Sequence, residues 1–279
     1  MVKFIVDSTF GLTREYVEQY DIKVVSLTLT LGSKEYDEGF REMWPDFYKK
    51  LAKSKTGGKT SQPSPEKFKK AIDEIYAQDP DSEILIFTIA DRLSGTIGSA
   101  NIAVSDYEGK KIAAVNSGEA GPSALMFMRE IVKAQQAGAT FEELLELAAD
   151  LQQRIAMQFI PASLTELARG GRVNKLLSRV GNILKIKPVF EFAKNDLSIY
   201  AKTLGFNRAA EAAIARLPQK FDSIMLYYIG DDKFIEPLKA RLESKLGIKD
   251  VEVEPMCLVG GVHIGIGTVG IVTLASKEQ

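Results

Sequence analysis

The first half of the chain alternates short apolar runs with segments of helical periodicity, and this alternation limits the fold more than any other feature. Residues 84–90 (ILIFTIA) are the clearest run, because an uncharged stretch of this length is typical of a strand buried on both faces. Such strands belong to parallel sheets that helices cover on either side. The sequence therefore predicts a parallel sheet, with strands at residues 2–6, 24–30, 84–90 and 112–115.

Helix signals fill the intervals between these strands. Ser64 is a cap residue, Pro65 suits the first helical position and Glu66 places an acid in the first turn. Thr140 with Glu143 three residues later forms a capping box. We expect helices at residues 13–19, 42–53, 65–75, 97–104, 122–136 and 140–154.

In the second half, the strands are joined by tight turns as well as by helices. Residues 187–192 and 197–200 flank the turn AKND, which predicts an antiparallel hairpin. Upstream, an apolar strand leads past Pro161 into a short helix that Gly170-Gly171 ends. Further elements are expected as a helix at 206–217, a strand at 223–229, a helix at 233–246 and a strand at 251–254.

The two patterns of strands and helices predict an α/β protein of two domains. Residues 1–160 would form an N-terminal parallel-sheet, Rossmann-like domain, and residues 161–279 a C-terminal domain with a mixed sheet. The uncharged stretch 255–276 is long enough to span a membrane, but glycines and His263 interrupt it. We interpret this stretch as strand–turn–strand.

Charge and cysteine content restrict the partners and the compartment. The chain has 36 Lys+Arg and 37 Asp+Glu, and without a basic excess we expect no nucleic-acid partner. Cys257 is the one cysteine, which excludes an intramolecular disulfide and fits a reducing compartment. The N-terminus, MVKFIVDSTF, has no signal-peptide pattern, so we expect a cytoplasmic protein.

Hydroxyl-rich turns follow three strands of the predicted sheet, and a fourth precedes a helix. Ligands of open parallel sheets bind beyond the carboxyl ends of the strands, where N–H groups of helix N-termini converge. Each turn alone can be a helix cap, but several at one edge favour a bound anion. Neutral donors without surrounding lysines suit a carboxylate. The turns are Asp7-Ser8-Thr9, Ser94-Gly95-Thr96, Asn116-Ser117-Gly118 and Thr60-Ser61-Gln62-Pro63-Ser64.

The sequence gives no signal for covalent catalysis, for a bound nucleotide phosphate or for a metal. Ser94 lies in RLSGT and not in the G-x-S-x-G elbow of serine hydrolases. No glycine-rich loop ends in Gly-Lys-Ser or Gly-Lys-Thr, and one His with one Cys cannot supply a zinc ligand set. We therefore expect no cofactor, no metal and no catalytic residue.

His263 and Arg172 each allow two interpretations. His263 is either a satisfied structural residue or, beside an anion, a donor that responds to pH. Gly170-Gly171 either only ends a helix, which leaves Arg172 exposed, or bends the chain so that the guanidinium reaches an acidic group.

Six short motifs together resemble the DegV family of fatty-acid-binding proteins. They are IVDST, KTSQPS, LSGT, RGGRV, IKP and the histidine between glycines in GGVHIGIG, in the family's order and over nearly the whole chain. The resemblance implies that a long-chain fatty acid lies between the two domains, with its carboxylate near the hydroxyl-rich turns and its tail in a buried tunnel.

The resemblance also implies site residues and a partner. Arg172 would complete the polar network at the carboxylate or serve the encounter with a kinase. Family members resemble binding subunits that present the fatty acid to a separate ATP-dependent fatty acid kinase, which forms an acyl phosphate. We therefore expect a lipid-binding protein, not an enzyme, and transient contact with a membrane surface is compatible with that role. The residues expected around the carboxylate are Thr60, Ser61, Ser94, Gly95, Thr96 and His263.

Four positions depart from the family pattern, and two other functions stay open. Asn116 stands where Asp is common, Asp91 and Arg92 stand where serines are common, and none of the three has an explanation in the sequence. Lys202 stands where the family often has arginine, which puts a kinase contact there in doubt. The alternatives are a stand-alone enzyme that acts on a small carboxylated or phosphorylated metabolite with His263 as acid or base, and a module that docks a peptide in an apolar cleft.

Overall fold

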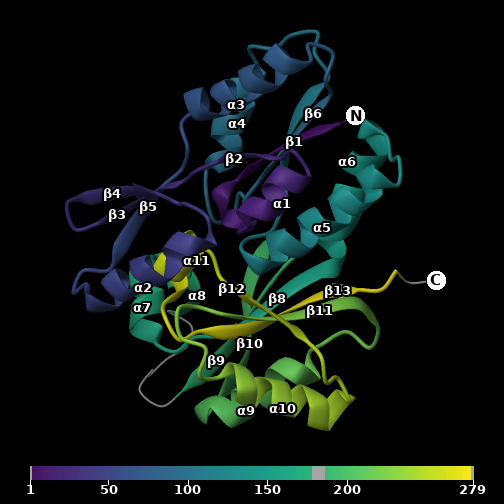
Figure 1. Ribbon diagram of the computed structural model, residues 1–279. Helices are drawn as coiled ribbons and strands as arrows, with labels where there is room; N and C mark the ends of the chain where they lie inside the picture. The colour runs from purple at the N-terminus through teal and green to yellow at the C-terminus, as the bar shows by residue number, and fades with distance from the viewer. Residues whose placement is uncertain (1, 178–185, 278–279) are drawn as a thin grey trace.

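The computed structural model describes residues 2–177 and 186–277 and arranges them in two α/β halves, one above the other in Figure 1. The upper half holds a four-stranded parallel sheet, the lower half a six-stranded mixed sheet, and a three-stranded sheet lies to one side. The predicted fold class, a parallel-sheet half followed by a mixed-sheet half, is confirmed.

The parallel sheet has the strand order β2-β1-β6-β7. Every residue of β6 is buried, as its apolar run predicts. Because β1, β6 and β7 are neighbours and parallel, the turns that follow them lie at one edge of the sheet. The strands are β1 (Lys3–Asp7), β2 (Lys23–Val25), β6 (Ile84–Thr88) and β7 (Ile112–Asn116).

Helices cover both faces of this sheet because successive strand residues point to opposite sides. Ile5 and Ile86 share one core with α3 and α4, whereas Phe4 and Phe87 belong to the core that includes α5 and α6. The capping box at Thr140 is confirmed. The helices of this half are α1 (Arg14–Gln19), α3 (Pro65–Gln78), α4 (Thr96–Val104), α5 (Pro122–Gln136) and α6 (Phe141–Arg154), with the 3-10 turn η1 (Ser8–Phe10) after β1.

The six-stranded sheet has the order β10-β9-β8-β13-β11-β12, and its neighbours are antiparallel except for β11 and β12. The predicted hairpin is confirmed as β9 and β10, whose turn residues Lys194 and Asn195 have left-handed φ values of 52° and 57°. Helices α9 (Gly205–Ala215) and α10 (Ile235–Leu246) pack on the outer face. The strands are β8 (Ile155–Ile160), β9 (Lys187–Ala193), β10 (Asp196–Thr203), β11 (Phe221–Tyr228), β12 (Glu252–Pro255) and β13 (Val269–Ala275).

The pairing of strand β8 affects where the boundary between the two halves is placed. It pairs with β9 and β13 of the six-stranded sheet, although the boundary predicted after residue 160 assigns it to the N-terminal half. We therefore propose that the division falls where α6 ends, at Arg154 and Ile155.

The three-stranded sheet corrects two expectations. Residues 24–30 were expected as one strand, but β2 ends at Val25 and β3 (Thr28–Leu31) joins another sheet, because the Leu27 N–H leaves the ladder to bond Ser8 Oγ at 3.0 Å. Thr60 and Ser61 lie in β5 (Gly58–Ser61) and not in a turn. Its partners are β3 and β4 (Lys34–Asp37), and η2 (Arg41–Met43) and α2 (Trp44–Lys53) connect β4 to β5. β4 and β5 have few apolar residues, so the sequence shows no strand pattern for them.

The stretch at 255–276 corrects a third expectation, because it forms helix α11 (Leu258–Ile264) followed by β13 instead of two strands. Its glycines permit close packing. A side chain at Gly261 would overlap the Tyr48 ring, and one at Gly260 would overlap Met256. The described residues include no helix long and apolar enough to cross a membrane. Two short helices, α7 (Leu164–Gly170) and α8 (Asn174–Leu177), lie nearby, and Gly171 ends α7 as predicted.

Candidate functional site

Asp7 organises the edge of the parallel sheet where the hydroxyl-rich turns lie. One carboxylate oxygen accepts the Thr9 N–H at 2.9 Å, and the other accepts the Ile89 N–H at 2.6 Å. Asp7 is fully buried, and burial raises its pKa to about 6 against the opposing effect of these bonds. The carboxylate thus joins the ends of β1 and β6, and both Thr9 and Ile89 face the main pocket.

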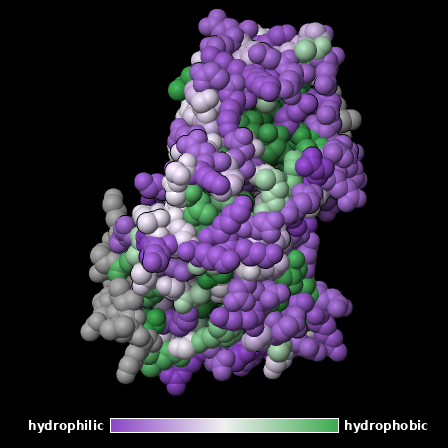
Figure 2. All heavy atoms as spheres, turned by 60° about the vertical axis from the view of Figure 1, so that its left-hand side comes forward, coloured by the Kyte–Doolittle hydropathy of each residue, from purple (hydrophilic) through white to green (hydrophobic). Residues whose placement is uncertain are grey.

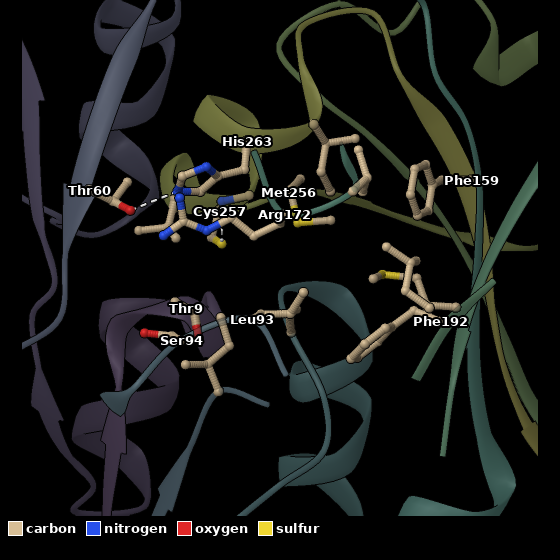
Figure 3. A pocket seen from close by; sticks show the side chains of 18 of the residues that line it. Thr9, Thr60, Leu93, Ser94, Phe159, Arg172, Phe192, Met256, Cys257 and His263 are labelled. Carbon is tan, nitrogen blue, oxygen red and sulfur yellow. Dashed lines mark hydrogen bonds between the residues drawn. The ribbon is translucent and has the colours of Figure 1, made fainter. Parts of the chain in front are cut away.

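That pocket lies between this edge and the six-stranded sheet, and α11 and the segment after α7 complete its walls. In Figure 3 the polar side chains gather at one end, and Phe159 and Phe192 lie at the other. The apolar wall includes Leu93, Met157, Phe159, Leu167, Phe192 and Leu197.

The outer surface differs from this interior. The face shown in Figure 2 is mostly hydrophilic, and hydrophobic atoms show in patches in the middle of the molecule. Met157, Phe159 and Phe192 are each at most 3% exposed. The apolar end of the pocket is therefore enclosed by protein.

A chain of hydrogen bonds through His263 defines the polar end. The Gly170 carbonyl can only accept, so His263 Nδ1 carries the proton and donates to it at 2.9 Å. The other ring nitrogen, Nε2, then accepts the Thr60 hydroxyl proton at 2.7 Å. Burial, and after it the nearby Arg172 charge, lower the pKa of His263 to about 4. The imidazole is therefore neutral at pH 7, and its tautomer is fixed.

Arg172 supplies the positive charge at this end. Its Nη1 donates to the Gly170 carbonyl at 3.3 Å, and among the described residues no carboxylate pairs with it. Desolvation lowers the pKa of the guanidinium, but the group stays charged at neutral pH. A half-exposed, unpaired guanidinium beside a neutral imidazole favours an anionic ligand.

The residues expected around the carboxylate are only partly brought together. Thr60, Ser94, Arg172 and His263 all line the pocket. Ser94 Oγ lies 2.9 Å from Thr96 Oγ1, but Thr96 is buried behind it and does not face the pocket.

Two further expected residues also lie outside the lining. Ser61 is exposed, because neighbouring strand residues alternate and Thr60 takes the inward face of β5. Gly95 lies against the Gln62 side chain.

Asp91, Arg92 and Asn116 have a structural explanation that the sequence did not provide. Asp91 accepts a hydrogen bond from Asn195 Nδ2 at 2.6 Å, and Arg92 lies 3.6 Å from Asp196. Asn116 Oδ1 accepts the Asp91 N–H at 3.2 Å. These contacts tie the loop before Ser94 to the turn between β9 and β10, across the two halves.

The chemistry of the site suits binding. Both ring nitrogens of His263 have partners, and the hydroxyl of Ser94 contacts Thr96, so the described contacts include no serine–histidine pair. The described residues also hold no group of three or more His, Cys, Asp or Glu side chains that could bind a metal.

The sequence placed Thr9 in one of the hydroxyl-rich turns but did not name it as a site residue, and it did not identify the apolar wall. Met157 and Phe159 alternate along β8, and Phe192 lies on β9. Alternation is a signal for one face of a strand, but it marks ordinary core in the same way.

Fold and pocket define a class: an α/β protein of two halves with a largely apolar pocket that has one polar end. A family model described as "Uncharacterised protein, DegV family" matches residues 1–276. The chain belongs to the DegV family, and the resemblance predicted from its motifs is confirmed.

Relatives with known names support the same grouping. The chain is 31% identical to a fatty acid-binding protein of Thermotoga maritima, with 96% of each chain covered. A fatty acid-binding DegV family protein from Thermus thermophilus has a similar fold, with a TM-score of 0.85, 25% identity and 99% of each chain covered. The fold is also similar to that of the Streptococcus pneumoniae Fatty Acid Kinase (Fak) B3 protein loaded with linoleic acid, with a TM-score of 0.80, 20% identity and coverage of 99% and 100%.

Proposed function

We propose that this protein binds a long-chain fatty acid, with the carboxylate at the polar end of the pocket and the chain along the apolar wall. One observation carries the proposal: a single pocket gathers unpaired and hydroxyl-bearing polar groups at one end and aromatic side chains at the other (Figure 3). The fatty acids bound by relatives of this chain support the choice of ligand.

The apolar end supplies most of the affinity. Burying about 15 methylenes at ~0.8 kcal/mol each gives roughly 12 kcal/mol of gross transfer free energy, from which the entropy of immobilisation is subtracted. The polar end therefore needs only to orient the carboxylate, for which a few donors are enough.

The donors at the polar end are unequal. The Ser94 hydroxyl and the Arg172 guanidinium are both available to a carboxylate oxygen, whereas the Thr60 hydroxyl proton is already directed at His263. Thr60 can donate to a carboxylate only if His263 Nε2 gains a proton and becomes the donor to Thr60. A carboxylate nearby favours that protonation because opposite charges raise the pKa of a histidine.

We further propose that the bound carboxylate is presented to an ATP-dependent fatty acid kinase, which makes the acyl phosphate. The likeness to the Fak B3 protein supports this partner only at the level of the fold. Arg172 lies at the edge of the pocket, where a partner could reach it. A cytoplasmic location, and transient contact with a membrane from which the lipid is taken, complete the proposal.

The variant Arg172→Ala separates binding from presentation. We expect the fatty acid affinity to fall by about 1 kcal/mol or less, because solvent screens a half-exposed charge. We expect the rate of acyl phosphate formation by an added kinase to fall further. Equal loss in the two assays would place Arg172 in lipid binding alone.

Extraction tests the ligand itself. The purified protein is denatured, extracted and analysed by mass spectrometry, and the delipidated protein is titrated with fatty acids of 8 to 20 carbons. We expect one acyl chain per protein and tight rebinding of a long chain. Absence of any stoichiometric lipid together with no rebinding would contradict the proposal.

A further inference from the structure

A buried glutamate outside the pocket connects the N-terminal half to helix α11. Glu38 follows β4 and is only 2% exposed. One of its carboxylate oxygens accepts the Ser8 hydroxyl proton at 2.7 Å, and the other accepts the Val259 N–H at 2.8 Å. Ser8 in turn accepts the Leu27 N–H at 3.0 Å. Glu38 therefore joins the exit of β1 to the first turn of α11.

Helix α11 carries much of the polar end of the pocket. It supplies His263, and its N-cap residue Cys257 and the first-turn residues Val259 and Gly260 also line the pocket. A small displacement of this helix would alter both bonds of the imidazole, since one partner lies on β5 and the other at the end of α7.

The packing around α11 leaves little tolerance for such a displacement. A side chain at Gly170 would overlap the His263 carbonyl, so the backbones of α7 and α11 are in direct contact. The Tyr48 hydroxyl bonds the Met256 carbonyl at 2.9 Å from the other side. Between these contacts, the Glu38 carboxylate accepts the Val259 N–H and Cys257 Sγ accepts the Gly260 N–H at 3.4 Å, so both groups hold the N-terminal turn.

We propose that Glu38 is a positioning residue of the fatty acid site, which holds α11 so that His263 bonds Thr60 and Gly170 together. This role of Glu38 rests on the proposed function, because it concerns a fatty acid site. The hydrogen bonds of Glu38 and His263 are present without a ligand. The role also explains why a carboxyl group lies in the core, where burial raises its pKa to about 7 and apolar side chains would be more stable.

The single histidine makes a direct test possible, because ¹⁵N labelling of histidine reports only on His263. In the wild type we expect the Nδ1–H tautomer and a pKa near 4. In Glu38→Ala we expect a mixture of tautomers and a pKa that moves toward 6.5, the ordinary value for histidine. We expect fatty acid to bind about tenfold more weakly, as for loss of one buried hydrogen bond.

Three further variants separate positioning from stability. Glu38→Gln keeps the shape and an acceptor for Val259, while its amide can donate to Ser8 Oγ, so we expect it to restore both the tautomer and the affinity. Ser8→Ala removes one of the two donors, and we expect a smaller shift in the same direction. Leu238→Ala creates a cavity under α10, in a separate core, and we expect it to lower stability without moving the His263 signals.

Two outcomes would overturn the proposal. One is unchanged His263 signals in Glu38→Ala, or in Ser8→Ala if the first variant does not fold. The other is a loss in Glu38→Gln as large as in Glu38→Ala, which would show that the charge and not the position matters. Failure of the wild type to bind fatty acid would instead contradict the proposed function and leave the histidine measurements valid.

Discussion

The two ends of the pocket are held together by different kinds of contact. The polar end depends on hydrogen bonds between distant elements, such as Thr60 on β5 and His263 on α11, 203 positions apart. The apolar end is formed mainly by side chains of the six-stranded sheet, with Leu93 and Leu167 beside them, and Phe159 stacks on Phe190 with ring centroids 4.8 Å apart. For the proposed ligand, the apolar wall would therefore supply the affinity, and a hydrogen-bond network that a single proton or hydroxyl can change would set the orientation.

The largest expected effect comes from filling the apolar end. Met157→Trp places a larger side chain in the space of the acyl chain, and excluding about four methylenes would cost ~3 kcal/mol, or ~100-fold in affinity for long chains. Chains of 8 to 10 carbons should lose much less. Titration calorimetry across chain lengths checks this, and Met157→Leu, which nearly conserves volume, is the control. Equal losses for all lengths would contradict the assignment of this end to the tail.

A matched pair on β5 tests the polar end. Thr60→Ala removes a hydroxyl inside the pocket and leaves His263 Nε2 without its donor, and we expect binding to weaken by about 1–3 kcal/mol. Ser61→Ala removes the neighbouring hydroxyl on the exposed face, and we expect no change. A loss of the same size in both variants would show that the TSQPS segment acts through its backbone instead.

The pH dependence of stability should distinguish the two ends. His263 has a pKa of about 4 in the folded protein and an ordinary value of 6.5, so between these values only the unfolded chain binds the proton. The contribution of His263 to stability is complete above 6.5 and is lost as the pH falls toward 4, by on the order of 3 kcal/mol.

Comparison with His263→Gln isolates this contribution, because the variant lacks the titrating group. Urea unfolding at several pH values should show a difference between wild type and variant that grows with pH and then levels off. Met157→Leu at the apolar end should leave the slope of the wild type unchanged. A difference that does not vary with pH would contradict the buried, neutral state of the imidazole.

The smallest effect is expected at the contact between the two halves, outside the pocket lining. Asp91→Ala removes the bond to Asn195 beside the pocket, and because the pair is exposed we expect a loss of only about 0.5 kcal/mol in stability. Faster release of a bound fluorescent fatty acid should accompany it. Asp91→Asn keeps an acceptor for Asn195 and should behave like the wild type. Release that is faster in both variants would exclude this hydrogen bond as the cause.

Elements with strong patterns were predictable from the sequence, and those held by long-range contacts were not. The apolar run of β6 and the capping box at Thr140 specify their structures locally. β4 and β5 are polar and are strands only because each pairs with β3. Helix α11 is rich in glycine and valine, and its conformation depends on close packing against α7 and Tyr48.

The site shows the same limit. The family motifs led to Thr60, Ser94, Arg172 and His263, all of which line the pocket. Glu38 lies in the charged stretch KEYDEG, where every pattern favours a solvated turn. Its burial follows from Ser8 and Val259, which are remote in sequence, so no local signal could have identified it.

The position of the last strand has a consequence for how the protein is made. β13 inserts between β8 and β11, and α11 just before it closes the pocket, so the walls come from nearly the full length of the chain. On the ribosome the parallel-sheet half can fold early, but the pocket cannot exist until β13 has emerged. A ligand bound in this pocket could therefore stabilise only the finished protein, and chains truncated during synthesis would lack that protection against degradation.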